Sequence, residues 1–416
     1  MPRFRLAVAL IVLAAPRALA ADFPHFEVQE IDPHLGQVCY ALTTADVNGD
    51  GKPDVVAVSE NAVVWYENPS WRKHDIIRDQ TKRDNVCIQA HDIDGDGRID
   101  FVLGAGWGPP DTATPSTLQW IGRDGEGRWV VHPINYDEPT LHRLQWGDVK
   151  GNGEKQLIVA PLQGRGTKGP NWGEGQGVRV LAFDIPDDPT QPDWPSELVD
   201  DSLHTIHNLL PFSPDGRGRE QVLLAAWEGV FVLDREADGR WTKTQVGSGN
   251  QETQPFKGSS EIKAGRLADG TTYLATIEPW HGTQVVVYTP PKPDRRNQDR
   301  AEGGSPLWRR QVVAEPLKWG HALWCADLDG DGDDELIVGQ RDSNPDGAPG
   351  PRGPGVYVFD PKSGPDGLTF DRHAVDEGGV ACEDALAADL DGDGRPDIVA
   401  GGRATHNVRV YWNRPR

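Results

Sequence analysis

Cysteine is scarce in this chain: four residues, Cys39, Cys87, Cys325 and Cys382, are scattered over 416 positions. Thiols so few and so widely spaced exclude a small fold held together by a disulfide framework. Cys39 and Cys382 occupy equivalent positions in the repeat described below. A bridge between them is one expectation for an oxidising compartment, and buried free thiols are the other.

Signals of several enzyme classes are missing too. The sequence contains no serine nucleophile elbow, no glycine-rich phosphate loop and no dinucleotide-binding fingerprint. Amphipathic helical patterns of any length are hard to find, whereas 48 Gly and 34 Pro residues suit a fold with many turns.

Positive charge is in deficit. There are 64 acidic residues against 42 Lys and Arg, a formal net charge of −22 at pH 7, and no basic block. Such a chain is a poor candidate for binding nucleic acid, because clustered Lys and Arg are what hold a phosphate backbone.

Only the N-terminus carries a long hydrophobic run. A basic start precedes the apolar run from Leu6 to Ala15, and Ala18-Leu19-Ala20 follows as a small-x-small cleavage site. This order predicts a secretory signal peptide over residues 1–20, because the run is too short to span a bilayer. We expect an exported protein, periplasmic or extracellular, with no membrane span after cleavage; an uncleaved anchor is the alternative.

One acidic motif recurs along the chain. Stretches of the form Asp-x-Asp/Asn-Gly-Asp-Gly-x-x-Asp/Glu, each followed by an apolar, β-branched run, occur four times. Carboxylates at alternate positions of a tight loop supply the oxygens that Ca²⁺ takes, and the glycines permit the sharp turn. The glutamate expected at position twelve of an EF-hand is missing, so each loop is expected to join two strands. A tight Asp-Gly turn that holds no ion is the alternative. The predicted calcium ligands are Asp46, Asn48, Asp50, Asp54, Asp92, Asp94, Asp96, Asp100, Asp327, Asp329, Asp331, Glu335, Asp389, Asp391, Asp393 and Asp397.

The acidic loop marks one position in a repeat of four strands, and seven units fit along residues 36–416. The last unit stops after its third strand, Val408 to Trp412, and a matching fourth strand stands at the other end of the chain as Phe26 to Ile31. A ring of blades closes without a free edge if the first strand completes the last blade. The sequence therefore predicts an all-β fold, a single seven-bladed β-propeller domain over residues 21–416, with calcium in blades 1, 2, 6 and 7. An open β-solenoid is the alternative.

The acidic repeats, with the Ile-Val-x-Gly type of strand that follows them, resemble FG-GAP or VCBS repeats, the type found in the integrin α-subunit head. The resemblance covers essentially the whole mature chain. It implies a propeller with calcium on one rim, but by itself it implies no reaction.

Histidines recur at one position of the repeat, six residues before the first acidic ligand or its equivalent. The residues at this ring position are Tyr40, Val86, His142, His207, Ser260, His321 and Glu383. Equivalent positions near a propeller axis form a ring, so these side chains are expected to converge. Neighbouring strand starts and the loops between second and third strands add Arg143, Glu261, Trp280, His281, Arg341 and Arg403 to the same face.

We assign these residues two candidate roles. The catalytic candidates are His142, His207, His281, His321, Glu261 and Glu383, and the substrate-binding candidates are Arg143, Arg341, Arg403 and Trp280. Imidazoles and carboxylates in a water-filled funnel suit Zn²⁺ or another divalent metal, and imidazoles also suit acid–base work near neutral pH. A metal that polarises a carbonyl, with a His base, allows removal of the proton α to that carbonyl. The structural alternatives are hydrogen-bonded histidines without a ligand role, tryptophans that pack within blades, and a plain ion pair between Arg403 and Asp384.

A second resemblance points to the same chemistry. The segments Ser260-Glu-Ile, Ile277-Glu-Pro-Trp-His281-Gly and Trp319-Gly-His321-Ala-Leu-Trp are similar to the propeller part of aldos-2-ulose dehydratases, which dehydrate keto-sugars. The resemblance implies His281 and His321, with Glu261 nearby, as functional positions. That family continues into cupin domains after its propeller, whereas this sequence ends at Arg416.

Three functions remain open at this stage. The first is a secreted, calcium-binding, metal-assisted lyase or dehydratase acting on a keto-sugar or related carbohydrate in the central funnel. The second is a non-catalytic propeller module that binds carbohydrate or protein. The third, a purely structural envelope protein, leaves the ring of histidines unexplained.

Overall fold

The computed structural model describes residues 23–214, 218–291, 306–344, 353–364 and 367–415. The signal peptide predicted over residues 1–20 lies outside these ranges. The described residues form strands β1 to β28 and no helix. None of the described residues forms a helix with the length and hydropathy needed to cross a bilayer.

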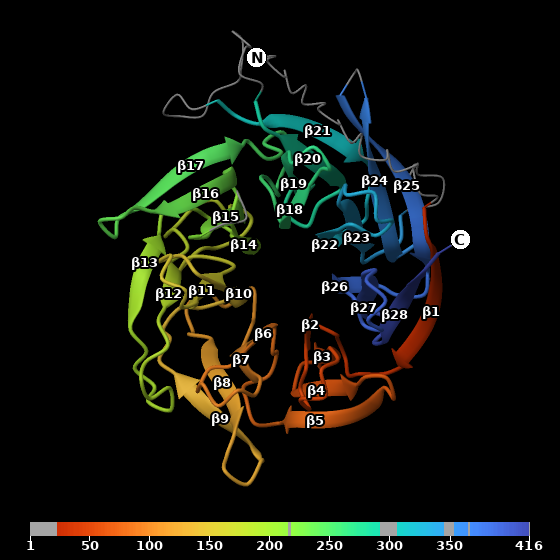
Figure 1. The fold of residues 1–416 in the computed structure, drawn as a ribbon. Helices are drawn as coiled ribbons and strands as arrows, with labels where there is room; N and C mark the ends of the chain where they lie inside the picture. Colours follow the sequence, from red (N-terminus) through yellow and green to blue (C-terminus); the bar gives the residue numbers. More distant parts are fainter. Residues whose placement is uncertain (1–22, 215–217, 292–305, 345–352, 365–366, 416) are drawn as a thin grey trace, which may run out of the picture.

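The strands form seven four-stranded sheets, each antiparallel, arranged as blades around a central axis (Figure 1). The predicted all-β, seven-bladed propeller is therefore confirmed. Blade 1 contains β2 (Ala41–Ala45), β3 (Asp54–Val58), β4 (Ala62–Glu67) and β5 (Arg72–Arg78). Blade 2 contains β6 (Cys87–His91), β7 (Asp100–Ala105), β8 (Thr117–Arg123) and β9 (Trp129–Ile134). Blade 3 contains β10 (Leu141–Gly147), β11 (Gln156–Pro161), β12 (Val180–Phe183) and β13 (Ser196–Asp200).

The remaining blades repeat this order, with the first strand nearest the axis and the fourth at the periphery (Figure 1). Blade 4 contains β14 (Asn208–Phe212), β15 (Gln221–Ala226), β16 (Gly229–Arg235) and β17 (Trp241–Gly247). Blade 5 contains β18 (Ile262–Arg266), β19 (Thr272–Glu278), β20 (Gln284–Thr289) and β21 (Arg309–Ala314). Blade 6 contains β22 (Gly320–Ala326), β23 (Glu335–Gln340), β24 (Gly355–Gly364) and β25 (Gly367–Glu377).

Blade 7 joins the two ends of the chain. Its strands are β26 (Cys382–Ala388), β27 (Asp397–Gly402), β28 (Val408–Arg414) and, as the outermost strand, β1 (His25–Asp32). β1 lies beside β28 (Figure 1) and pairs with it antiparallel, and Val28 lies opposite Tyr411. The predicted closure by the N-terminal strand is confirmed, and it leaves blade 7 with the same four strands as every other blade.

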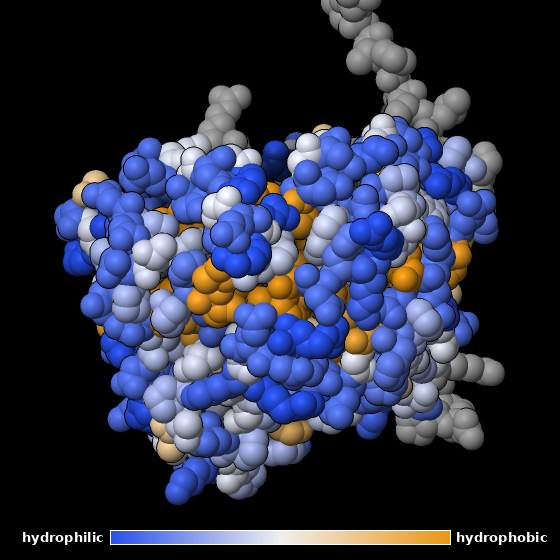
Figure 2. All heavy atoms as spheres, turned by 90° about the horizontal axis from the view of Figure 1, so that it is seen from below, coloured by the Kyte–Doolittle hydropathy of each residue, from blue (hydrophilic) through white to orange (hydrophobic). Residues whose placement is uncertain are grey.

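The hydrophobic core is divided into seven clusters, each lying between two neighbouring blades. All residues of the second strands β3, β7, β11, β23 and β27 are buried. Because both faces of these strands are covered, their central residues form continuous apolar runs and do not alternate with polar ones. On the side of the ring seen in Figure 2, hydrophilic residues dominate around a strip of hydrophobic ones.

All four cysteines are free thiols, three of them buried. Cys39 and Cys382 pack so closely against neighbouring strands that glycine is needed opposite each: a Cβ on Gly401 would lie 2.3 Å from Cys39 Sγ. Burial raises the pKa of the Cys87 and Cys325 thiols to about 12, which disfavours the reactive thiolate. Of the two expectations for Cys39 and Cys382, the structure shows buried thiols.

The four acidic loops connect the first and second strands of blades 1, 2, 6 and 7, at the end of each first strand away from the ring position. The first aspartate of a loop accepts backbone N–H groups, as when Asp46 accepts those of Gly49 and Gly51 at 2.8 Å. The last acid turns back inside the loop, where Asp54 accepts the N–H of Val47 at 2.9 Å. In blade 3 Asp148 caps its loop in the same way, but Lys150 occupies the position of a ligand and pairs with Asp184 at 2.6 Å.

Candidate functional site

β-Bulges aim three ring-position residues at the axis. The register between first and second strands shifts between Leu141 and Arg143, between Gly320 and Ala322, and between Cys382 and Asp384. The extra residue at each shift is His142, His321 and Glu383 respectively. A bulge re-aims a side chain that regular pleating would point elsewhere. The same type of bulge therefore brings residues of blades 3, 6 and 7 to one end of the central channel, the space around the propeller axis.

A compact histidine cluster forms at this end of the axis. One ring nitrogen from each of His207, His281 and His321 lies within 4.8 Å of the others. Nε2 of His207 is 3.0 Å from Nε2 of His281. His142 lies beside them, with its ring centroid 4.6 Å from that of His207. We call these four residues the histidine cluster.

A hydrogen bond at Nδ1 of His321 and an ion-pair contact at Nδ1 of His207 indicate which nitrogens carry protons in these two rings. Nδ1 of His321 is 2.7 Å from the backbone oxygen of Glu383, which only an N–H can satisfy. Nδ1 of His207 is 2.8 Å from Oε1 of Glu261, and a carboxylate there likewise favours a proton on Nδ1. In both rings Nε2 then carries a lone pair, and both Nε2 atoms face the shared space.

The short loop after β19 positions His281. Glu278, the last residue of β19, is fully buried and accepts hydrogen bonds from Tyr288 Oη at 2.7 Å and from Arg310 Nε at 2.8 Å. His281 has a φ of 51°, in the left-handed region. A Cβ on Gly282 would lie 2.2 Å from the backbone of Glu278, so only glycine allows so tight a return. This tight return directs His281 toward His207 and His321.

Glu383 lies on the opposite side of the cluster, between two arginines. Its Oε1 is 2.5 Å from Arg403 Nη1 and 3.9 Å from His321 Nε2, and its Oε2 is 3.6 Å from Arg341 Nη1. Arg403 also lies over the ring of Tyr40, with its Cζ 5.7 Å from the ring centroid. The two arginines offset the charge of a carboxylate that is only 4% exposed.

These groups enclose a cavity of about 150 Å³. His142, His281 and His321 line it together with Arg143, Arg341, Arg403 and Glu383, and Tyr40 and Trp107 add aromatic walls. Neither ring nitrogen of His142 has a hydrogen-bond partner in the described part of the chain. His142 therefore offers the cavity an imidazole with both nitrogens unengaged.

The four imidazoles of the histidine cluster are held neutral. Burial lowers the pKa of His142, His207, His281 and His321 well below the usual value of 6.5, and the nearby arginines lower each further. A neutral imidazole is the form that binds a metal ion or accepts a proton.

Three predicted site residues, His207, Glu261 and Trp280, do not line this cavity; His207 is fully buried in the histidine cluster beside it. Trp280 is 6% exposed and packs against Phe256, with ring centroids 5.0 Å apart, so it supports His281 from behind. Glu261 contacts His207 from the far side and lines a second, deeper cavity in the channel. Trp107 was not among the predicted binding residues, although it lines the cavity and stacks near His142.

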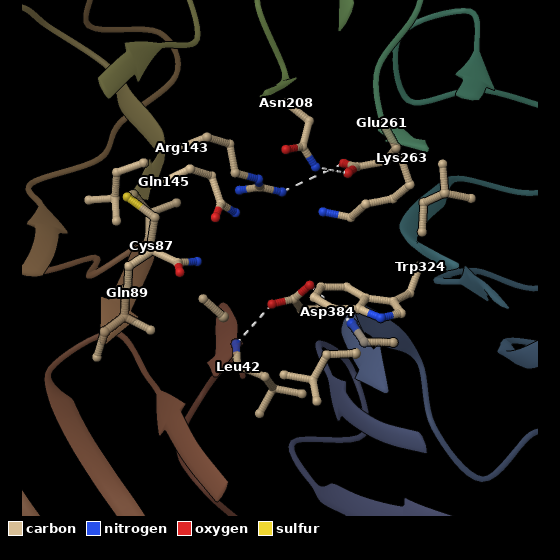
Figure 3. Close-up of a pocket in the computed structure, with 17 residues that line it drawn as sticks. Leu42, Cys87, Gln89, Arg143, Gln145, Asn208, Glu261, Lys263, Trp324 and Asp384 are labelled. Atoms are coloured by element: carbon tan, nitrogen blue, oxygen red, sulfur yellow. Dashed lines mark hydrogen bonds and ion pairs between the residues drawn. The ribbon is translucent and has the colours of Figure 1, made fainter. Parts of the chain in front are cut away.

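Lys263, in the deeper cavity, is absent from the sequence-based set. It lies on β18, two positions after Glu261, which immediately precedes that strand, and side chains two apart in an extended chain share a face (Figure 3). That alternation was the signal that could have found it.

At the other end of the channel, the acidic loops bring carboxylates together. In three loops, one oxygen from each of three acids lies within 4.8 Å of the others: Asp92, Asp94 and Asp96; Asp327, Asp329 and Glu335; Asp389, Asp391 and Asp397. Burial, aided by the neighbouring acids, raises the pKa of Asp100, Asp329 and Asp397 to about 6 and that of Glu335 to about 9. Crowded, partly buried carboxylates of this kind fit a hard cation.

Fold and site together define a closed propeller with repeated acidic loops on one face and a histidine cluster on the other. Comparison with known proteins confirms both resemblances noted in the sequence. Residues 46–103 match the model for the FG-GAP-like repeat, and residues 116–291 match that for the β-propeller domain of aldos-2-ulose dehydratase.

The aldos-2-ulose dehydratase of Phanerodontia chrysosporium is 28% identical to this chain over 326 residues. The matched region covers 74% of this chain but 34% of the relative, so the chain spans about a third of that protein's length. Among solved structures, BBS1N in complex with ARL6DN shares the fold, with a TM-score of 0.53 and 13% identity over 96% of this chain and 98% of that one.

Proposed function

We propose that this protein is an exported, metal-assisted lyase that dehydrates a keto-sugar or a related carbohydrate in the cavity at the histidine cluster. The observation that carries the proposal is the convergence of His207, His281 and His321 nitrogens within 4.8 Å of one another. The match of residues 116–291 to a dehydratase propeller supports the choice of reaction and of a carbohydrate substrate.

The donor set of the cluster fits Zn²⁺ or another borderline divalent metal. His207 and His321 present lone pairs on Nε2, and the 3.0 Å between the Nε2 atoms of His207 and His281 needs a proton or a cation to offset their repulsion. Glu261 behind His207 is the outer partner that a ligating histidine ordinarily has. When bound, such a metal supplies a Lewis acid for a substrate carbonyl.

His142 is the best-placed base. Its imidazole lines the cavity, is neutral, and has both nitrogens without a partner in the described residues. In the proposed step His142 takes the proton on the carbon α to the carbonyl. The electrons of that C–H bond form the C=C bond while the β C–O bond breaks. The leaving hydroxyl takes the proton back from His142 and departs as water, so no oxidant or reductant is needed.

The remaining lining residues suit a sugar. Arg341 and Arg403 present guanidinium N–H donors that can reach sugar hydroxyls while they hold Glu383. Tyr40 and Trp107 offer apolar faces on the same side. This mixture of aromatic faces and fixed donors is typical of small-molecule sites, and the small cavity favours a single sugar ring.

Turnover of keto-sugars, followed as new ultraviolet absorbance, tests the proposal. Wild type should convert at least one keto-sugar, and His142→Ala and His321→Ala should lose about 100-fold or more in rate. His204→Ala is the control, because His204 pairs with Glu228 outside the cluster. Equal rates in all four proteins would remove the histidine cluster from the mechanism.

For the acidic loops we propose Ca²⁺ in blades 1, 2, 6 and 7, with a role in holding the rim and no part in the reaction. The carboxylate clusters support this, and in blade 1 Asn48 contributes an amide oxygen where the others have an aspartate. Lys150, paired with Asp184, supports an ion-free loop in blade 3.

A binding module without catalysis is the second candidate. The ion pair between Arg403 and Glu383 favours this candidate, because a carboxylate held in a structural contact is less available for a reaction. Metal analysis separates the two: calcium alone in the purified protein favours the module, and stoichiometric zinc, manganese or a similar metal favours the enzyme.

A further inference from the structure

The acidic loop of blade 6 is the one of the four that ends on a glutamate, Glu335. Glu335 begins β23 and is fully buried, and its Oε2 accepts the backbone N–H of Leu328 at 2.5 Å. Its Oε1 has no hydrogen-bond partner in the described residues. A buried carboxylate oxygen without a donor is costly, because it has lost water and found no replacement.

The third strand of the blade explains why this oxygen is left over. In blades 1 and 7 the second oxygen of the last acid accepts a backbone N–H at 2.8 Å from the end of the third strand, donated by Asn68 and Asn413 respectively. The register of β23 with β24 places Pro361 at the equivalent position of blade 6. Proline has no N–H to donate, so the backbone at this position leaves Glu335 Oε1 unsatisfied.

The same strand brings a second acid to this oxygen. Leu336 pairs with Phe359, so Glu335 and Asp360 are the next residues on the two strands, and directly opposite residues of an antiparallel pair share a face. Asp360 is 3% exposed, and its Oδ2 pairs with Lys362 Nζ at 2.6 Å. Its Oδ1 has no hydrogen-bond partner in the part of the chain that the structure describes. Asp360 therefore presents a buried, unsatisfied oxygen on the face of Glu335.

A third acid completes the group. Oxygens of Asp329 and Glu335 lie within 4.8 Å of one another, and Asp329 Oδ2 is likewise buried and without a partner among the described residues. Burial raises the pKa of both acids, and the charge of Asp360 raises the pKa of each further. Together with the first and third ligands of the loop, this makes five carboxylates against the one ammonium of Lys362. The group carries an excess of negative charge that fits a divalent cation.

Two other blades show that a cation at the loop reaches this position of the third strand. In blade 3 the equivalent acid is Asp184, and Lys150, at the second ligand position, contacts its two oxygens at 2.6 and 2.7 Å. In blade 4 the equivalent acid is Asp234, which Arg219 contacts at 2.6 Å. In blade 6 the second ligand position holds an acid instead, so the cation that Lys150 supplies in blade 3 has to come from solution.

We propose that Asp360 is a further ligand of the calcium ion in blade 6, contributed by the third strand, and that blade 6 is the tightest of the four calcium sites. This inference rests on the calcium proposed above for the acidic loops. Asp360 supplies Oδ1 and Glu335 supplies Oε1, while Lys362 holds the Asp360 carboxylate in place through Oδ2.

The other three calcium blades differ at this position. Gly122 and Trp412 occupy it in blades 2 and 7. In blade 1 the residue is Glu67, but its carboxylate pairs with His74 at 3.0 Å and its side chain is 35% exposed. Affinity for Ca²⁺ rises with the number of charged ligands, so blade 6 should fill first.

Calorimetric titration of the full chain, stripped with a chelator and then dialysed, tests the assignment with calcium as the ligand. Wild type should show one binding event clearly tighter than the others, and Asp360→Asn should weaken that event about tenfold or more and leave the weaker sites unchanged. Glu377→Gln is the control, because it removes the same charge from an exposed position at the other end of blade 6.

The outcomes separate this inference from the one beneath it. If Asp360→Asn titrates like wild type while wild type binds calcium, the role of Asp360 is overturned and calcium in the loops stands. If wild type binds no calcium, both are overturned.

The crystal structure of calcium-bound wild type gives a measurement that needs no variant. An oxygen of Asp360 should lie about 2.3–2.6 Å from the ion in blade 6. An ion held there by the loop acids alone, with Asp360 in contact only with Lys362, would limit the site to the loop and overturn the inference.

Discussion

Nε2 of His207 and Nε2 of His281 lie 3.0 Å apart, although the two residues come from different blades and are 74 positions apart in the chain. His207 precedes β14 of blade 4, and His281 belongs to the loop after β19 of blade 5. Two neutral rings at this distance need a shared proton or a shared cation. Either one ring donates its Nε2–H to the lone pair of the other, or both rings present lone pairs to one cation.

The first prediction concerns this pair. His281→Ala should remove one of the three converging nitrogens and lower transition-metal occupancy to near zero after dialysis, because structural or catalytic zinc needs at least three protein ligands. Elemental analysis of wild type and variant measures it. His204→Ala, a histidine that pairs with Glu228 outside the cluster, should retain the metal content of wild type.

Glu261 provides the second prediction. Its carboxylate lies 2.8 Å from Nδ1 of His207, so Glu261→Gln should weaken the hold on the ring and lower metal affinity about 10–100-fold. Competition with a chromophoric chelator gives the affinity. Glu60→Gln is a matched control, because Glu60 is also buried and accepts the backbone N–H of Gln37 without touching a histidine. If the metal affinity of Glu261→Gln is unchanged, Glu261 does not support metal binding and only lines the deeper cavity.

The third prediction is a pH dependence of stability in protein stripped of transition metals and supplied with calcium. Burial lowers the folded-state pKa of His142 well below the unfolded value of about 6.5. Below pH 6.5 the unfolded chain then binds a proton that the folded chain does not, so His142 makes stability fall as pH drops from about 7 toward the folded pKa. Buried acids with raised pKa, such as Asp384 at about 6, act in the opposite direction.

The difference between variants isolates the histidine term. His142→Phe should lose less stability than wild type between pH 7 and pH 5, as measured by denaturant unfolding at each pH. Replacement of the exposed His25 by Phe serves as the control. Parallel curves for wild type and His142→Phe would contradict the depressed pKa of His142.

Much of this architecture was predictable because it repeats. The acidic loops fixed the period, and the count of strands gave both the seven blades and the closure by β1. Counting back from the loops also selected His142, His207, His321 and Glu383, which the structure brings to one end of the channel. A repeat converts sequence position into spatial position, and this is why residues far apart in the chain were grouped correctly.

The rest depended on local geometry that the repeat does not encode. The bulges at His142, His321 and Glu383 let the ring residue and its successor both face the axis, so Arg143 and Asp384 line the channel as well. Lys263 lies further along β18 than the ring position and its successor, which were the positions considered in each blade, so it was missed. The sequence also gave no sign that Trp280 would pack against Phe256 behind His281.

Calcium gives the fourth prediction. Chelation should lower the melting temperature, because the crowded carboxylates of each loop repel one another without a cation. Asp94→Ala and Asp391→Ala should each reduce bound calcium by about one ion per chain. Asn152→Ala in the loop of blade 3 should leave the calcium content unchanged, since Lys150 already pairs with Asp184 there. Calorimetric titration counts the sites, and a melt unaffected by chelation would argue for ion-free Asp-Gly turns in all blades.

The last prediction concerns the seam between blade 7 and blade 1. Asp32 ends β1, and its carboxylate accepts hydrogen bonds from Tyr66 Oη at 2.5 Å and Lys73 Nζ at 2.7 Å, so the strand that closes the ring is tied to the neighbouring blade. Tyr66 is fully buried, and Asp32→Ala leaves its hydroxyl without this acceptor. The variant should lose about 1–3 kcal/mol in the free energy of unfolding, the usual cost of a buried polar group that loses its partner.

Glu27→Ala on the same strand is the control for this seam, because the side chain of Glu27 is 62% exposed and meets Arg414 only at 3.7 Å. An exposed pair at that distance contributes little, so Glu27→Ala should unfold at nearly the same denaturant concentration as wild type. If both variants matched wild type, pairing of β1 with β28 alone would hold the ring closed. If Asp32→Ala alone is destabilised, the contact between Asp32 and blade 1 contributes to closure of the ring. The closed ring in turn holds together the blades that carry the histidine cluster.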